Sequence, residues 1–271
     1  MIKIENTQVV GWEHAIRGMR NPKNSWDRMD SCVCDPDSDN CDHCARYVVG
    51  KMDEECGDIP AGDFVIGPND QKLMMSLAKG GPVHAKYRRM ITVYVDITAP
   101  LYWWKEFDTY KIGTVANSCS TMHKIHDKEL TLDDFSHEHL LADERYGWDD
   151  NTDIEVLRKT IDHLNYWRDV YNNGRERHAY SAIDDSLKPK SKYAFDRMIQ
   201  LLPSSYNQKR TIMLNYEVLA GIYPMRRNHK LDEWRVFCDW IEGLPYSEII
   251  TGPKMLNKKM NVPEDPDWEG K

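Results

Sequence analysis

The run with the most hydrogen-bonding side chains lies at residues 106–125, EFDTYKIGTVANSCSTMHKI. It combines hydroxyls, an amide and a thiol with the side chains of Lys111, His123 and Lys124. Cations beside small hydrogen-bonding groups could bind a phosphate-bearing ligand. The same residue types are also typical of an exposed loop. The run is therefore either a binding surface or a connection.

Cysteines form a second candidate constellation. Cys41-x-x-Cys44 has the spacing of a zinc knuckle, and Cys34 and Cys56 would complete four thiolate ligands, with Cys32 as an alternative ligand. The pattern indicates a structural zinc site, and a loop of free thiols is the alternative. Because the segment is an insertion, a zinc bound there would stabilise a loop rather than perform catalysis.

Composition narrows the class of protein. A net charge of -8 over 271 residues argues against a surface for a nucleic-acid polymer, although small anionic ligands stay compatible with it. The chain is long enough to bury a full core. It has no apolar run of the ~20 residues that a membrane span needs, and acids interrupt Met1–Trp12, so we expect a cytoplasmic protein without membrane contact.

The elements that must position these residues follow a strand, helix, strand, helix order in the first half. The helix at 67–81 has Asn69 or Asp70 as its expected N-cap and two glycines as its stop. The strand at 87–100 alternates apolar and polar residues and ends at a proline. The segments concerned are strand 1–10, helix 11–20, helix 67–81, strand 87–100 and helix 101–110.

Helical patterns dominate the second half, at 152–174, 190–203, 208–227 and 229–245. Strands followed by helices predict an α+β fold rather than a doubly wound sheet. We expect one catalytic domain over 1–250, with a Cys-rich insertion at about 30–63, followed by a C-terminal tail over 251–271.

With these elements in place, the sequence resembles the flavin-dependent thymidylate synthases. The first block of the likeness is a helix that leads into His84, followed by a strand that ends in Ala99-Pro100 and by the aromatic helix LYWWKEF. The run 106–125 comes next, and it lies where the family has the signature Arg-His-Arg-x-x-Ser-x-Asn-x-x-Ser-x-Arg. A second block fits Leu202-Pro203 and then, in order, Asn215, Arg226, His229 and Trp234. The resemblance implies an antiparallel sheet with a largely helical C-terminal half.

The resemblance also implies site residues. Arg226 would read the uracil edge, and Ser120 would lie near the substrate phosphate. The implied catalytic residues are Arg226 and Ser120, the cofactor-binding residues are His84, Lys111, Thr114, Asn117, Asn215 and His229, and the substrate-binding residues are Ser120, His123, Lys124 and Arg226.

Each of these assignments has a structural alternative. Arg226 ends a basic helix terminus and would complement its dipole, Ser120 would be a plain N-cap, and a lone histidine such as His84 is more often structural. Trp103 and Trp104 are expected in the core or in a subunit contact rather than against a cofactor.

The chain departs from the family pattern at its arginines. Thr109-Tyr110-Lys111 stands where the family has Arg-His-Arg, and Met122 stands at the final arginine. Glu217 replaces another arginine, and an acid there would repel a pyrophosphate. Lysine lacks the bidentate fork of arginine, so affinity or substrate choice would differ.

Three functions follow from the resemblance and its departures. The first is transfer of a one-carbon unit from methylenetetrahydrofolate to dUMP, with FAD and NADPH, in a homotetramer whose sites lie between subunits. The second is a related one-carbon modification of another pyrimidine nucleotide. The third is a non-catalytic nucleotide-binding protein that kept the fold.

Overall fold

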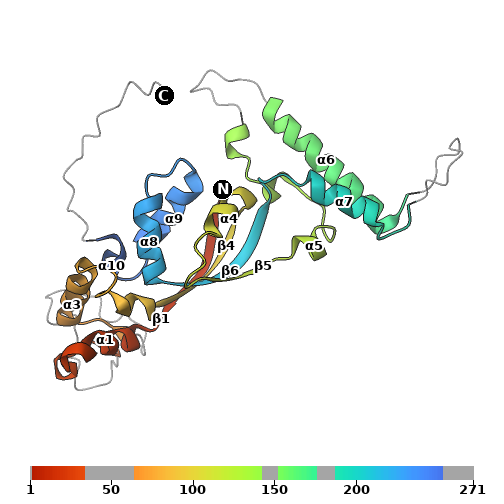
Figure 1. Ribbon diagram of the computed structural model, residues 1–271. Coiled ribbons are helices and arrows are strands. Elements are labelled where there is room, and N and C mark those ends of the chain that lie inside the picture. Colours follow the sequence, from red (N-terminus) through yellow and green to blue (C-terminus); the bar gives the residue numbers. More distant parts are fainter. Residues whose placement is uncertain (1, 34–63, 142–151, 176–186, 253–271) are drawn as a thin grey trace, which may run out of the picture.

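A four-stranded antiparallel sheet forms the centre of the protein (Figure 1). The structure is a computed structural model that describes residues 2–33, 64–141, 152–175 and 187–252. The predicted α+β class with an antiparallel sheet is confirmed. In spatial order the strands are β1 (Lys3–Val10), β4 (Thr92–Pro100), β6 (Asn207–Asn215) and β5 (Val115–Ser118).

One face of the sheet carries the main core. Val93, Val95 and Ile97 of β4 are at most 1% exposed, whereas Tyr94 between them is 44% exposed, as the alternation in sequence predicts. Helices cover the buried face with large aromatic side chains, which include Trp103. These helices are α4 (Leu101–Phe107), α8 (Tyr216–Arg226) and α9 (Asp232–Glu242).

The expectation of a helix over 208–227 is wrong in its first part. Residues Asn207–Asn215 form β6, which pairs with β4 along its whole length, and α8 starts at the next residue. The change from strand to helix needs no glycine or proline. Asn215 ends the strand, and its side chain accepts a hydrogen bond from the N–H of Val218 as the helix N-cap.

Helices α1 (Trp12–Arg20), α3 (Pro68–Lys79) and α10 (Glu248–Thr251) form one end of the molecule. The expected N-cap of α3 is wrong, because the helix starts at Pro68 after Gly67. Asp30 instead supplies the capping carboxylate, which accepts the N–H groups of Asn69 and Asp70. The side chain of Asp70 is thereby left for another partner.

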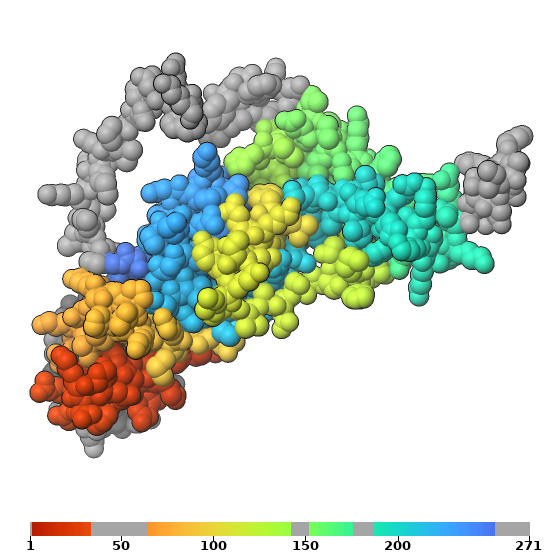
Figure 2. Space-filling model, viewed as in Figure 1, coloured from red at the N-terminus to blue at the C-terminus, as the bar shows by residue number. Residues whose placement is uncertain are grey.

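The opposite end is a pair of helices, α6 (Thr152–Asn173) and α7 (Lys192–Leu201). They enclose a second apolar cluster with the preceding segment, which includes Leu130 and Phe135. Figure 2 shows this green to cyan part projecting away from the red and orange helices of the other end. None of the helices among the described residues is long and apolar enough to span a membrane.

Two short strands bring together the chain on either side of the Cys-rich segment. In β2 (Cys32–Val33) and β3 (Phe64–Val65), Cys32 pairs with Val65 and Val33 pairs with Phe64. The four preferred zinc ligands, Cys34, Cys41, Cys44 and Cys56, lie outside the described residues. Single 3₁₀ turns occupy Asn21–Lys23, Trp26–Arg28, Lys86–Arg89, Leu132–Asp134 and Glu138–Leu140.

Candidate functional site

A single carboxylate oxygen joins three elements at the candidate site. Glu106 Oε2, on α4, accepts hydrogen bonds from Arg226 Nη1 at 2.6 Å and from the Trp234 indole N–H at 2.9 Å. His229 Nε2 lies 3.5 Å from the same oxygen. Because these three partners come from the end of α8, the following turn and α9, Glu106 fixes the relative placement of all of them.

The guanidinium of Arg226 is held on several sides. Its Nε donates to the Tyr110 hydroxyl at 2.9 Å, and its Cζ lies 4.5 Å from the centroid of the Trp234 ring. The side chain is only 18% exposed. Of its three nitrogens, Nη2 is the one without a hydrogen-bond partner among the described residues. This nitrogen can therefore donate to a ligand carbonyl.

The geometry around His229 defines its neutral tautomer. The backbone N–H of Leu231 donates to His229 Nδ1 at 3.1 Å, so in the neutral ring the proton resides on Nε2. That nitrogen faces Glu106. His229 thus belongs to the Glu106 cluster, the group of Glu106, Tyr110, Arg226, His229 and Trp234, with its Nε2 directed toward the carboxylate. The sequence places His229 near Arg226 only through the family resemblance.

The predicted signature segment meets the start of α8. Gly113 has a φ of +76°, and a Cβ built on it would lie 3.1 Å from both Asn215 Nδ2 and a Val218 methyl group. The next residue, Thr114, carries a hydroxyl that is buried without a hydrogen-bond partner in the described part of the chain. Lys111 is exposed beside this segment. Gly113 thus brings the segment that carries Lys111 and Thr114 against Asn215 at the start of α8.

The remaining predicted residues follow the edge strand away from α8. Asn117 lies in β5 opposite Thr211, and Ser120 caps the four-residue helix α5 (Thr121–Lys124) by accepting the His123 N–H at 3.2 Å. Lys124 forms an exposed ion pair with Asp127 at 2.7 Å. Figure 1 shows α5 beyond β5, on the other side of the sheet from α8. Ser120, His123 and Lys124 therefore do not meet Arg226 within one chain.

The carboxylate of Glu217 pairs with an arginine that no sequence pattern predicts. Arg88 Nε lies 2.8 Å from Glu217 Oε2, and Arg88 Nη1 donates to the Ile249 carbonyl. The pair neutralises the charge that was expected to repel a pyrophosphate. His84 is exposed in the loop between α3 and the Lys86–Arg89 turn, and its side chain lies beside Gly80. Among the described residues, His84 makes no contact with the Glu106 cluster.

Two of the cluster's contributors, Glu106 and Tyr110, were not predicted as site residues. A signal for Glu106 exists in sequence, because it lies three residues after Trp103 and therefore shares the apolar face of its helix. Trp103 and Trp104 are 0% and 1% exposed, which confirms their core assignment. No cluster of three metal-ligating side chains occurs in the residues that the structure describes.

A polar network lies on the uncovered face of the sheet. Asp96 accepts hydrogen bonds from the Thr211 hydroxyl and the Asn6 amide, and Lys209 lies 3.2 Å away. The Thr211 hydroxyl, the Asn6 amide and the Lys209 ammonium lower the pKa of the Asp96 carboxyl to about 2. The network links β1, β4 and β6 on this face.

This lowered pKa predicts an acid-dependent contribution to stability. A carboxyl whose folded pKa lies below its ordinary value of 3.8 stabilises the fold above that pH, and the contribution is lost as the pH falls toward 2. Urea midpoints of the wild type and Asp96→Asn should therefore differ at pH 6 and converge near pH 2. A difference that stays constant over this range would contradict the assignment.

No protein-family model matches the sequence, and no curated protein matches it. Solved structures do match its fold. A thymidylate synthase X from Helicobacter pylori with FAD and dUMP aligns with a TM-score of 0.54 at 13% identity, covering 92% of this chain and 96% of that one. A second structure, a flavin-dependent thymidylate synthase ThyX from the same organism complexed with FAD and dUMP, aligns with a TM-score of 0.53 at 14% identity, covering 91% and 96%.

A third structure is the UMP/dUMP methylase PolB from Streptomyces cacaoi bound with 5-Br dUMP, with a TM-score of 0.49 at 14% identity, covering 93% of this chain and 95% of that one. At the identities of the two Helicobacter structures, the likeness concerns the backbone arrangement. The sheet order, the helices that cover the sheet and the extent of the match together show that the chain has the fold of the flavin-dependent thymidylate synthases.

Proposed function

We propose that the protein transfers a one-carbon unit from methylenetetrahydrofolate to a pyrimidine deoxynucleotide, with dUMP as substrate and dTMP as product, and with FAD and NADPH for the reduction. The observation that carries this proposal is the Glu106 cluster, in which a partly buried arginine is oriented with one nitrogen unused. The fold supports it, since the two Helicobacter structures with this backbone arrangement contain FAD and dUMP.

Arg226 is the proposed reader of the pyrimidine. Tyr110 and Glu106 fix two of its nitrogens, and Trp234 fixes its plane, so that Nη2 is presented in one direction. A planar cation held in this way polarises a ring carbonyl and favours attack on the ring. Little side-chain entropy remains to be lost when the nucleotide binds.

The segment around Gly113 at the start of α8 is the proposed contact for the flavin. The buried hydroxyl of Thr114 lacks a partner, and a buried group of this kind costs about 1–3 kcal/mol until one is supplied. Gly113 leaves room beside the Asn215 amide. Lys111, Asn117 and His84 would complete the contacts. FAD, when bound, supplies hydride transfer.

The residues that are expected to bind the substrate phosphate require a second subunit in this proposal. Ser120, His123 and Lys124 lie beyond β5, so they serve a nucleotide held by Arg226 of another copy. The uncovered sheet face supports self-association, because Tyr94, Met213 and Val115 align across three strands. Ile112, close to β5, is 92% exposed. We propose a homotetramer, and light scattering on the purified protein measures its mass.

The proposal predicts a yellow protein that retains flavin absorbance through gel filtration. With dUMP, methylenetetrahydrofolate and NADPH, mass spectrometry should find a product heavier by one methyl group in place of a hydrogen. The same protein should relieve thymidine dependence in cells that lack thymidylate synthase. A colourless protein that also fails to take up added FAD would overturn the proposal.

Glu106 favours a second candidate substrate. Its Oε1 atom has no hydrogen-bond partner among the described residues, and a carboxylate only accepts hydrogen bonds. An amino-pyrimidine such as dCMP offers a donor at the position where uracil has a carbonyl. Parallel incubations with dUMP and dCMP decide between them, since a mass change with dCMP alone would assign the protein to the second reaction.

A further inference from the structure

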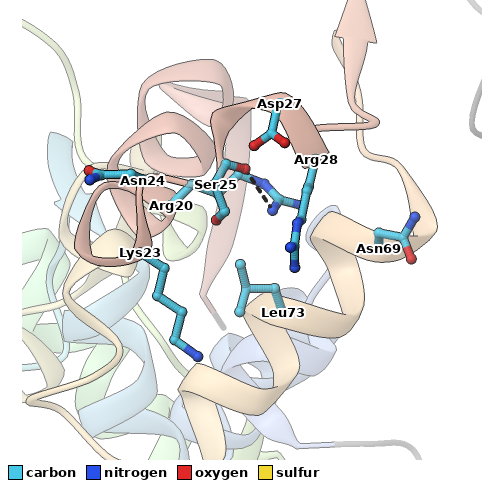
Figure 3. A pocket seen from close by; sticks show the side chains of 8 residues that line it. All are labelled: Arg20, Lys23, Asn24, Ser25, Asp27, Arg28, Asn69 and Leu73. Atoms are coloured by element: carbon cyan, nitrogen blue, oxygen red, sulfur yellow. Dashed lines mark hydrogen bonds between the residues drawn. The ribbon is translucent and has the colours of Figure 1, made fainter.

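A cavity of about 830 Å³ opens between α1, the turns that follow it and α3 (Figure 3). Its size lies in the range of cavities that hold small molecules. It is separate from the Glu106 cluster, which lies on α4, α8 and α9. The lining residues are Arg20, Lys23, Asn24, Ser25, Asp27, Arg28, Asn69 and Leu73.

A buried ion pair forms the floor of this cavity. The guanidinium of Arg20 contacts Asp70 Oδ1 through Nε and Nη2, both at 2.6 Å, and donates through Nη1 to the Ser25 carbonyl. Asp70 Oδ2 accepts the backbone N–H and the hydroxyl of Ser31. Because the side chains of Arg20 and Asp70 are 5% and 0% exposed, this floor ties α1 to α3 and fixes the shape of the cavity.

Two cations on the walls have no such partner. The side chains of Lys23 and Arg28 form no ion pair or hydrogen bond in the described part of the chain, and Figure 3 shows them on two sides of Leu73. Among the described residues that line the cavity, Asp27 is the one acid, and in Figure 3 its carboxylate lies across the cavity from the Lys23 amine. The nearby carboxylate of Asp30 already accepts two N–H groups of α3.

We propose that this cavity binds a small phosphate ester, with the phosphate held between Lys23 and Arg28. Arginine offers a planar fork that matches phosphate oxygens, and lysine adds a second charge. The amides of Asn24 and Asn69 supply further donors and acceptors for the polar part of the ligand. Leu73 supplies an apolar contact for the remainder. The site is independent of the proposed one-carbon chemistry.

Calorimetry on the full chain tests the proposal, with ADP and, separately, inorganic pyrophosphate as probes at about 0.15 M salt. The wild type should bind both probes. Lys23→Gln combined with Arg28→Gln should weaken binding by about tenfold or more, since two charge-assisted contacts are lost. Both residues are exposed, so the fold should be kept, and circular dichroism checks this.

The matched control replaces two exposed cations of α1 and α3 that do not line the cavity, in an Arg17→Gln and Lys72→Gln double variant. It carries the same change in net charge and should bind both probes like the wild type. Equal losses in the two double variants would overturn the proposal in favour of nonspecific attraction. No binding of either probe to the wild type would also overturn it. Unchanged dUMP affinity in the Lys23/Arg28 variant keeps this result separate from the proposed active site.

Discussion

Asp70→Ala is expected to lower the free energy of unfolding by about 3–5 kcal/mol, because it leaves a buried guanidinium without its counter-charge. Arg20 Nε and Nη2 both contact Asp70 Oδ1. The change also removes the acceptor of the Ser31 hydroxyl and of the N–H groups of Asp30 and Ser31. Few single substitutions exceed this range.

Urea denaturation of the wild type and the variant measures this loss. Asp96→Ala is the matched control, since Asp96 also accepts several hydrogen bonds and contacts a cation but lies on the outer face of the sheet. Asp96→Ala should lower the free energy of unfolding far less, because solvent replaces the lost carboxylate as a partner of the exposed groups. Equal losses for the two variants would show that burial of the Arg20 and Asp70 pair does not determine its contribution.

Arg226→Ala is expected to weaken dUMP binding by about ten- to a hundredfold, the range for a hydrogen bond to a charged group. Arg226→Lys should weaken dUMP binding nearly as much as Arg226→Ala, since one ammonium cannot keep the contacts to Tyr110 and Glu106 and also reach the ligand. Equilibrium binding of dUMP to each variant, with the flavin in excess, gives the change in affinity.

The adjacent Arg227 provides the control for this prediction. It ends the same helix but pairs with Asp239 and Glu242 on α9, at 2.7 and 3.1 Å. Arg227→Ala removes the same charge from the helix terminus and should leave dUMP affinity unchanged. If Arg226→Ala binds dUMP as tightly as the wild type, Arg226 serves only the helix terminus. Glu106→Gln should give an intermediate loss, because it keeps the size of the side chain but not its charge.

Local patterns were sufficient to predict the elements with strong periodicity. The alternation in Thr92–Pro100 predicted which side chains of β4 are buried, and the apolar spacing over 152–174 predicted α6. In both cases the residues that pack against the core recur at the period of the element itself. Through the family resemblance, the sequence also indicated that Arg226, His229 and Trp234 belong together.

The elements and contacts that local patterns could not predict depend on pairing between distant segments of the chain. All four residues of β5 are exposed, so no periodicity marks the strand, and it exists only through its pairing with β6. The strand β6 continues into α8 without a break residue, and its polar first half hides its character. Glu106 and Arg226 are 120 positions apart. The spacing within α4 could therefore indicate an acid on the apolar face of the helix, but not the partner of that acid.

The strand order also bears on how the chain folds as it is synthesised. The central pair of the sheet joins β4 to β6, whose residues are made more than a hundred positions later. Until β6 is synthesised, β1 is the one neighbouring strand of this sheet that is available to β4. The helices α8 and α9, which bury the apolar side chains of β4, are made later still. Long-range pairing of this kind slows folding and exposes nascent chains to aggregation. The sheet is therefore completed only after most of the polypeptide has left the ribosome.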